Sequence, residues 1–236
     1  MINIKKITVT LMMLLFCCLI SACGSQEKEA GVSGDAAAKA REDGYKLSPI
    51  YGSALSEEEL KIWQAAQDDE ISGLTPFTIL AERSGEEISS LFLCRDMMNT
   101  GLDGWYITDI RSDESGKVIS CTPQVFDIWI DTYGFYDTPK IPENKGWKIR
   151  IPSNTDLIVK DMYGIFQIAA KHVEKEISYV PVVLLAEQLV AGTNYKYLCT
   201  DKSGSNLYIL DIYEDMNSGA KITGTGYVDL TPYEGK

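Results

Sequence analysis

The residues with the clearest chemical potential lie in one predicted hairpin tip, Gln188-Leu189-Val190-Ala191-Gly192, between strand-like runs at 179–190 and 194–199. Val190 and Ala191 are small and apolar, so they can enter a narrow cleft with little desolvation cost. Gly192 can take the left-handed backbone conformation that a tight turn requires. The tip therefore predicts binding by shape rather than by charge or bond chemistry.

Groups that could perform catalysis are scarce. His172 is the only histidine and falls among charged residues on a predicted helix face, which is typical of a solvated position. Cys94 and Cys199 occupy equivalent strand positions in a repeat, which indicates packing, and a nucleophile would need a base nearby. The sequence contains no metal-ligand cluster, glycine-rich phosphate loop or serine elbow. We therefore expect no enzyme, no cofactor and no metal site.

A second group of chemically interesting residues is aromatic. Residues 126–137 are dense in aromatics and carboxylates, and Trp147 follows soon after. Trp129, Tyr133, Tyr136 and Trp147 can be interpreted as a ligand surface, since aromatics beside carboxylates suit sugars or peptides. The other interpretation is a seam that joins two domains, which we favour because such a seam must be filled.

The N-terminus has the pattern of a targeting segment. Lys5 and Lys6 precede an apolar run at 7–20 that is too short to span a membrane comfortably. The run ends at Ile20-Ser21-Ala22-Cys23, which resembles a bacterial lipoprotein signal. The resemblance implies cleavage before Cys23 and acyl chains such as palmitate on that cysteine, which would hold the protein at the extracytoplasmic face of a bacterial membrane. A plain secretory signal cut near Ala22 is the alternative.

Composition limits the partners of the mature chain. Cleavage removes two of the 22 basic residues and none of the 34 acidic ones, which leaves 20 − 34 = −14 charges. This charge argues against nucleic acid as a partner. Residues 23–44 are polar and small, as expected for a flexible tether. Cys94, Cys121 and Cys199 allow one disulfide at most, and Cys94 and Cys121 are not expected to pair because their strands are not neighbours.

The folded part contains an internal repeat. Residues 75–82 align with 180–187 at an offset of 105, and 92–94 align with 197–199 at the same offset. After a three-residue difference in length, 105–110 align with 207–212, and 115–117 then align with 218–220. Order, spacing and chemistry persist together, which indicates two copies of one unit.

The residue pattern of each copy predicts a helix followed by a four-stranded antiparallel meander. Ser56 and Glu59 form a capping box for the first helix, and an apolar stripe predicts the second at about 156–175. Strands are expected at about 179–190, 194–200, 206–214 and 220–230, joined by breaks that suit antiparallel neighbours. A further strand at 147–151 would lead into the second helix.

The hairpin sequence resembles that of the cystatins, protein inhibitors of papain-like cysteine proteases. Gln188, Val190 and Gly192 match the Q-x-V-x-G positions of that family, and 193–195 and 222–227 continue its wording. The resemblance implies an α+β fold of two tandem cystatin-like units, each with one helix on a four- to five-stranded antiparallel sheet. We expect a signal at 1–22, a tether at 23–44, repeat 1 at 45–130, a linker at 131–146 and repeat 2 at 147–236.

The function implied by the resemblance is inhibition of a papain-like cysteine protease by a wedge. The residues implied in protease binding are Gln188, Leu189, Val190, Ala191, Gly192 and Met216. The second hairpin lacks the Pro-Trp pair common in the family, and the tip of repeat 1, residues 83–87, is charged and should not inhibit. The alternative function is a non-catalytic lipoprotein that binds a protein or ligand, or acts as a sensor, with the fold as scaffold.

Overall fold

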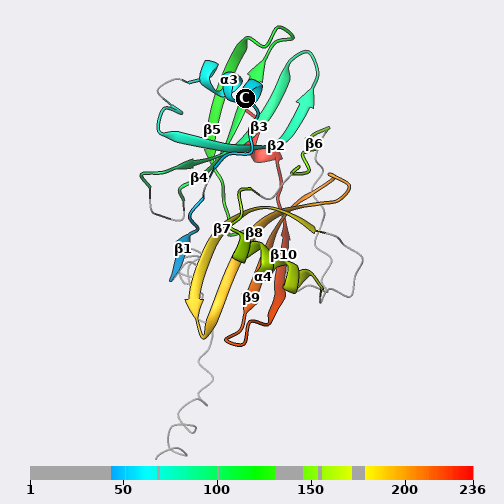
Figure 1. The fold of residues 1–236 in the computed structure, drawn as a ribbon. Helices are drawn as coiled ribbons and strands as arrows, with labels where there is room; N and C mark the ends of the chain where they lie inside the picture. The colour runs from blue at the N-terminus through cyan, green and yellow to red at the C-terminus, as the bar shows by residue number, and fades with distance from the viewer. Residues whose placement is uncertain are drawn as a thin grey trace, which may run out of the picture. The chain divides into compact units, whose positions relative to one another are not determined.

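The computed structural model describes residues 44–50, 52–67, 70–99, 101, 103–130, 146–153, 156–171 and 179–235. These residues form two five-stranded antiparallel sheets (Figure 1). The N-terminal sheet has the order β5-β4-β3-β2-β6 and the C-terminal sheet the order β1-β7-β8-β9-β10. The long strands of the N-terminal sheet are β2 (Leu74–Ser84), β3 (Ile88–Asp96), β4 (Trp105–Ser112) and β5 (Val118–Val125). Those of the C-terminal sheet are β7 (Tyr179–Val190), β8 (Gly192–Asp201), β9 (Leu207–Glu214) and β10 (Ala220–Tyr227).

One α-helix covers one face of each sheet. Helix α3 (Glu57–Ala65) starts with the expected capping box, in which the Ser56 amide donates to Glu59 Oε2 at 2.6 Å and the Ser56 hydroxyl oxygen accepts from the Glu59 amide at 3.3 Å. Its Trp63 packs on Phe92 of the N-terminal sheet, with ring centroids 5.5 Å apart. Helix α4 (Lys160–Lys171) begins later than expected and packs Phe166 against Tyr197, at 5.6 Å. A short 3-10 helix, η1 (Thr231–Tyr233), follows the last strand.

The faces of the sheets that point away from the helices share a single core. Leu91, Leu93 and Ile107 of the N-terminal sheet belong to the same buried cluster as Val183, Leu185 and Ile209 of the C-terminal sheet. A hydrogen bond also joins the sheets, since the Trp105 indole N–H donates to the Leu185 carbonyl oxygen at 3.1 Å. Both sheets are therefore buried on two faces, one beneath a helix and one against the other sheet.

The predicted α+β fold of two tandem cystatin-like units is wrong. Among the described residues strands account for 47% and helices for 15%, so this part of the chain is mostly β-sheet, with α3 and α4 as its two α-helices. The prediction failed because apolar positions on the second face of each strand carry no mark of what will cover them. They pack against the partner sheet, and the halves thereby lose the independence that tandem units would have.

The leading strands are exchanged between the halves. Strand β1 (Tyr45–Leu47) leads into α3, yet it pairs with β7, with Lys46 opposite Glu187. Strand β6 (Lys148–Ile149) leads toward α4, yet it pairs with β2, with Lys148 opposite Glu82. The expectation that 147–151 completes the second unit is therefore wrong, because this strand extends the first sheet.

The two halves follow the same backbone path in detail. The pairing of β2 with β3 shifts register after Pro76 and after Ile79, and that of β7 with β8 shifts after Pro181 and after Leu184, each 105 positions later. Beyond the last strands, the Trp129 amide donates to Asp127 Oδ1 at 2.8 Å, and the Thr231 amide donates to Asp229 Oδ1 at 2.9 Å. Each position in one half can thus be compared with its counterpart in the other.

Candidate functional site

Two hairpin tips project from the same end of the C-terminal sheet (Figure 1). The first joins β7 to β8 and the second joins β9 to β10, and Thr193 lies opposite Glu214 where the two meet. Leu189 and Met216 are each 84% exposed and Val190 is 45% exposed. We call Leu189, Val190, Ala191 and Met216 the apolar edge. A wedge of the kind that the hairpin motif implies requires these tips to project from one exposed edge, and the structure brings them together at one end of the sheet.

The turn between β7 and β8 depends on Gly192. Val190 pairs with Gly192, so that Ala191 alone forms the tip. Gly192 has φ of +128°, in the region that favours glycine, as expected for a tight turn. A Cβ atom here would lie 2.3 Å from the Glu214 carbonyl oxygen and 2.8 Å from the Tyr213 hydroxyl. The glycine therefore allows both the turn and the close approach of β9.

Side chains from the neighbouring strands hold the tip in place. The Tyr213 hydroxyl donates to the Ala191 carbonyl oxygen at 2.6 Å. At the base of the tip, Asn194 Nδ2 donates to Gln188 Oε1 at 2.7 Å, so that Gln188 supports the hairpin. The Tyr195 hydroxyl donates to Glu214 Oε2 at 2.8 Å, and burial followed by this bond raises the pKa of Tyr195 to about 12. Tyr195 therefore stays a donor at neutral pH.

The second tip is capped by Asp215. Its Oδ1 accepts from the Asn217 amide at 2.7 Å and from the Gly219 amide at 3.0 Å, while its own amide donates to the Gly219 carbonyl oxygen at 2.8 Å. Ser218 has φ of 64°, which closes the turn. Met216 makes no contribution to this capping, although it is the most apolar residue of the loop.

The loop between β4 and β5 has the same construction. Asp113 Oδ1 accepts from the amides of Ser115 at 2.9 Å and Lys117 at 3.0 Å, and Gly116 has φ of 83°. Glu114 stands where the C-terminal half has Met216. The sequence alignment of 115–117 with 218–220 is thus displaced by one residue.

The first hairpins of the two halves also correspond, and they too differ at the tip. Ser84-Gly85-Glu86-Glu87 of the N-terminal sheet occupy the positions of Leu189-Val190-Ala191-Gly192. The same hairpin position therefore carries polar and acidic residues in one half and mostly apolar residues in the other. The matched hairpin of the N-terminal half forms without exposed apolar side chains at these positions, so the hairpin itself does not require them.

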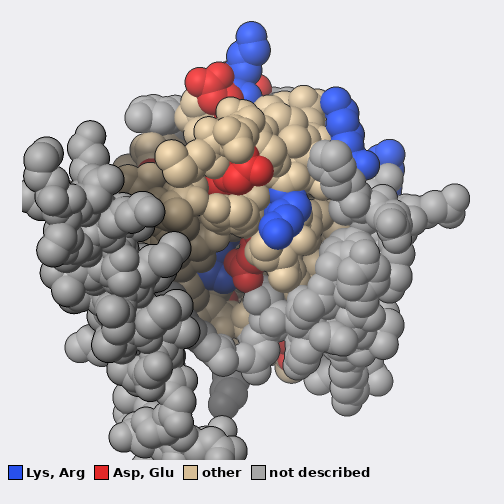
Figure 2. Space-filling model, turned by 90° about the horizontal axis from the view of Figure 1, so that it is seen from below, with Lys and Arg blue, Asp and Glu red and all other residues tan. Residues whose placement is uncertain are grey.

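Charged residues lie beside the apolar edge: Glu214 is opposite Thr193, and Asp215 precedes Met216. Figure 2 looks onto the end of the molecule that carries these tips, and uncharged atoms predominate among those that it describes, with separate acidic and basic side chains. Lys46 lies opposite Glu187 in the β1–β7 pair, and Glu214 is occupied by Tyr195. The exposed Leu189, Val190 and Met216 side chains provide the apolar surface at this end of the C-terminal sheet.

The aromatic residues are placed in two different environments. Trp129 is half-buried, edge-on to Tyr45 at 5.0 Å, with the Lys196 ammonium 4.8 Å from its ring centroid. Trp147 is 6% exposed, donates to Glu234 Oε1 at 3.2 Å and lies under Arg83 at 4.6 Å. Tyr133 and Tyr136 lie outside the described residues.

Lys196 in turn is bound to Asp211 at 2.6 Å. Trp129 comes from the segment after β5 of the N-terminal half, whereas Lys196 and Asp211 lie in the C-terminal sheet. The contacts of Trp129 and Trp147 therefore join segments of one half to the other half, and the ligand surface formed with Tyr133 and Tyr136 stays a prediction.

The described residues offer little for catalysis. Cys94 and Cys199 are buried, burial raises the pKa of both thiols, and the sulfur atoms of Cys94, Cys121 and Cys199 are not joined in disulfides in this structure. No group of His, Cys, Asp and Glu side chains in the described ranges could hold a metal ion. His172 and Cys23 lie outside the described residues. Within those same ranges no helix is long and apolar enough to cross a membrane.

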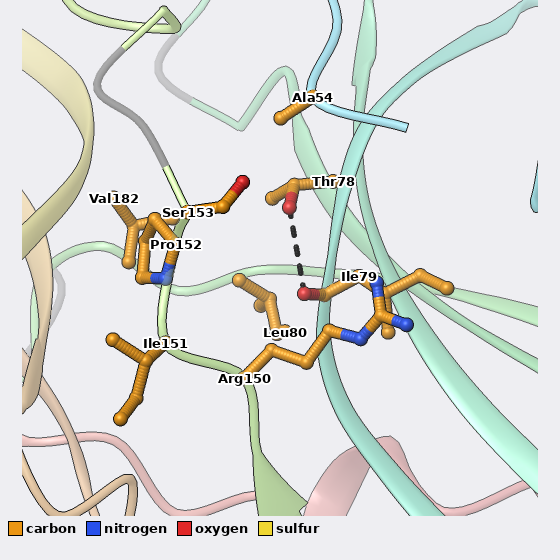
Figure 3. A pocket seen from close by; sticks show the side chains of 9 residues that line it. All are labelled: Ala54, Thr78, Ile79, Leu80, Arg150, Ile151, Pro152, Ser153 and Val182. Carbon is orange, nitrogen blue, oxygen red and sulfur yellow. Dashed lines mark hydrogen bonds between the residues drawn. The ribbon is translucent and has the colours of Figure 1, made fainter. Parts of the chain in front are cut away.

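A cavity of about 210 Å³ lies beside β2 (Figure 3). Of its described lining residues Arg150 alone is ionisable, and it forms ion pairs with Glu59 and, at 3.2 Å, with Glu82. Apolar side chains supply much of the rest of the lining, including Ile79, Leu80, Ile151 and Val182. Among the lining residues that the structure describes, no acid and base, or nucleophile and base, meet in this cavity.

Sequence reasoning missed Tyr213, because the repeat does not mark this position: the matching residue of the N-terminal half is Arg111. Arg111 has a different role and bonds to Gly235. The Asp-x-x-Ser/Gly pattern of the two capped loops was available in the sequence and would have aligned Met216 with Glu114. Comparisons with models of protein families, with curated proteins and with solved structures gave no match for this chain.

Proposed function

We propose that this chain is a non-catalytic binding protein that docks its apolar edge into a cleft of a partner protein, and that the partner is a papain-like cysteine protease which the docking inhibits. The chain would act from the extracytoplasmic face of a bacterial membrane, held there by lipid on Cys23. The proposal retains the hairpin motif and its implied role, without the cystatin fold.

One observation carries the proposal: two loops of matched construction differ in their exposed tips. Glu114 and Met216 occupy the same position in capped turns, and the paired hairpins carry Glu86 in one half and Ala191 in the other. Exposed Leu, Val and Met side chains that folding does not require mark a surface for interaction. Burying each of them would contribute about 1.5–3 kcal/mol.

The geometry suits a wedge rather than a flexible recognition loop. The bond from Tyr213 to Ala191 and the close packing of Gly192 on β9 fix the first tip, and Asp215 fixes the second. A tip ordered before binding loses little conformational freedom when it docks. Inhibition follows because a wedge that fills the cleft excludes substrate without presenting an extended chain for cleavage.

A titration of the soluble chain that begins after Cys23 tests the proposal, with papain and a cathepsin as proteases. We expect stoichiometric loss of peptidase activity at micromolar protein or below. Gly192→Arg should abolish inhibition, because a side chain here has no space beside the Glu214 carbonyl oxygen. The proposal is wrong if the parent chain does not inhibit at micromolar concentration, or if the variant inhibits equally well.

A folding control is needed for Gly192→Arg, because the substitution strains the turn itself. Met216→Glu copies the residue found in the matched loop at Glu114 and leaves the Asp215 cap intact. It should weaken inhibition at least tenfold with an unchanged midpoint of urea unfolding. Equal inhibition by this variant would remove Met216 from the binding surface.

A further inference from the structure

The cavity beside β2 has an apolar inner wall and a polar rim (Figure 3). Leu80 and Val182 line its inner wall, and both side chains are buried. Thr78, Arg150 and Ser153 also line it, and Arg150 and Ser153 are exposed. Its volume of about 210 Å³ exceeds the roughly 150 Å³ of an apolar protein cavity that holds benzene. The cavity therefore has room for a molecule the size of a substituted benzene ring.

The inner wall carries a smaller residue than the matched position of the other half. Val182 matches Phe77, because each follows a proline and each lies at the first register shift between its two strands. The Phe77 ring is buried and packs on Trp105, with centroids 6.1 Å apart. Val182 has no ring to place there and borders the cavity instead.

A second lining residue shows the same difference in size. The segments after β6 and β1 run alike, because the amides of Arg150 and Ser48 donate to matched carbonyl oxygens of β2 and β7, at 2.8 and 3.2 Å. Two residues further along, Pro152 lines the cavity, whereas Ile50 belongs to the shared core. Apolar atoms of a ligand would thus meet apolar surface that the smaller residues leave uncovered.

The Thr78 hydroxyl supplies a polar contact within the cavity. It donates to the Ile79 carbonyl oxygen at 3.4 Å, the bond that is dashed in Figure 3. A hydroxyl donor ordinarily lies about 2.5–3.0 Å from its acceptor, so a ligand oxygen that comes closer can replace this bond. The hydroxyl oxygen can also accept a bond from a ligand hydroxyl.

The charges at the rim favour a neutral ligand. The Arg150 guanidinium forms ion pairs with Glu59 and, at 3.2 Å, with Glu82. One cation therefore faces two carboxylates, which leaves an excess of negative charge beside the cavity. An anionic ligand would be repelled by this excess, although arginine by itself suits anions.

We propose that this cavity is a binding site for a small neutral molecule that has an aromatic or branched apolar body and one hydroxyl or carbonyl group. The apolar body lies on Leu80, Pro152 and Val182, and the oxygen bonds to Thr78. The site is separate from the apolar edge, because Val182 is eight residues before Val190 in β7, roughly 26 Å along an extended strand. It therefore goes beyond the proposed function and does not depend on it.

Benzyl alcohol is a suitable probe, and toluene is its matched control because it has the same ring without the hydroxyl. Both would be titrated into the soluble chain that begins after Cys23 and followed by the amide NMR signals of Leu80, Ile151 and Ser153. We expect saturable shifts at millimolar benzyl alcohol. The ratio of the benzyl alcohol to the toluene association constant should fall at least fivefold in Thr78→Val, which keeps the side-chain shape and removes the hydroxyl. Absence of saturable shifts at these amides, or an unchanged ratio, would overturn the inference.

Two further arms test the location and the charge. Val182→Phe copies the matched residue and should weaken benzyl alcohol binding at least tenfold, with circular dichroism to show that the variant is folded; if it is not folded, Thr78→Val decides. Benzoate, the anionic analogue, should bind the parent chain at least tenfold more weakly than benzyl alcohol. Parental binding by folded Val182→Phe would contradict the location, and benzoate binding as tight as that of the alcohol would contradict the assignment to neutral ligands.

Discussion

The Tyr213 hydroxyl donates to the Ala191 carbonyl oxygen across 2.6 Å, and this bond ties the first hairpin tip to strand β9. Its counterpart in the other half, Arg111, contacts Gly235 instead of a hairpin tip. The brace is therefore specific to the half that carries the apolar edge. It explains how a turn with a single residue at its tip keeps one conformation while its side chains remain exposed.

Removing this brace should affect binding more than folding. Tyr213→Phe deletes one partly exposed hydrogen bond, which contributes about 1 kcal/mol, or roughly a fivefold change in affinity if the tip must be ordered to dock. Amide hydrogen exchange at Ala191 and Gly192 should quicken, and the free energy of unfolding should fall by no more than about 1 kcal/mol. A variant with parental affinity would show that the brace does not prepare the tip.

Alanine substitutions at Gly116 and Gly192 should separate the cost of backbone strain from that of steric crowding, as measured by the free energy of unfolding. Gly116→Ala places Cβ in open space at positive φ, so we expect a loss of about 1–2 kcal/mol in the free energy of unfolding. Gly192→Ala adds a clash with the backbone of β9, so the loss should reach about 2–5 kcal/mol. Urea unfolding of both variants measures the difference, and equal losses would contradict the close approach of β9 to the turn.

The shared core predicts one cooperative unfolding transition. Phe92→Leu lies beneath α3 and Phe166→Leu lies in α4, and each should lower the unfolding free energy by about 1–2 kcal/mol. Both variants should shift the whole transition, as measured by tryptophan fluorescence and by circular dichroism. Two separable transitions, with each variant shifting only one, would indicate independent units.

Alkaline pH should destabilise the protein. Burial is the main cause that raises the pKa of Tyr45, Tyr195 and Tyr233 to about 12, from an ordinary value of 10.0. Between about pH 10 and 12 the unfolded chain releases protons that the folded chain keeps, so the stability present below pH 10 is lost as pH rises through this range. The free energy of unfolding, measured in urea at several pH values from 8 to 12, should fall over that interval. A constant value from pH 10 to 12 would contradict the burial of these hydroxyls.

Local features of the fold could be predicted from the sequence because they depend on neighbouring residues. The Ser56–Glu59 capping box, the strands that make up the repeat and the tight turn at Gly192 all belong to this class. Each follows from the chemistry of a few adjacent side chains.

The pairing of distant segments could not be predicted in the same way. Strand β6 is short, and Lys148 and Ile149 suit the edge of either sheet, so its pairing with β2 depends on how the whole chain is arranged. The hydrogen bond from the Trp105 indole to the Leu185 carbonyl oxygen also joins residues that are far apart in the sequence. These contacts make the two sheets one sandwich, and they are the reason why the predicted tandem units were wrong.

The residues of the candidate site could be named from the sequence, but their match with residues of the N-terminal half could not. The tip at 188–192 and Met216 were visible in the sequence, whereas the match between Met216 and Glu114 needed the Asp215 and Asp113 caps. Only with that match do the exposed apolar side chains become a difference between two equivalent loops.

The most direct measurement is to replace the apolar tip residues by those of the N-terminal half and to titrate the variant against papain. One variant carries Leu189→Ser, Val190→Gly and Met216→Glu, the residues of the N-terminal half, and the other carries Glu114→Met as the matched control. The account predicts at least a hundredfold weaker inhibition for the first variant, an unchanged inhibition constant for the second, and the same urea midpoint for both. Parental inhibition by the first variant would contradict the claim that the apolar edge is the surface that docks.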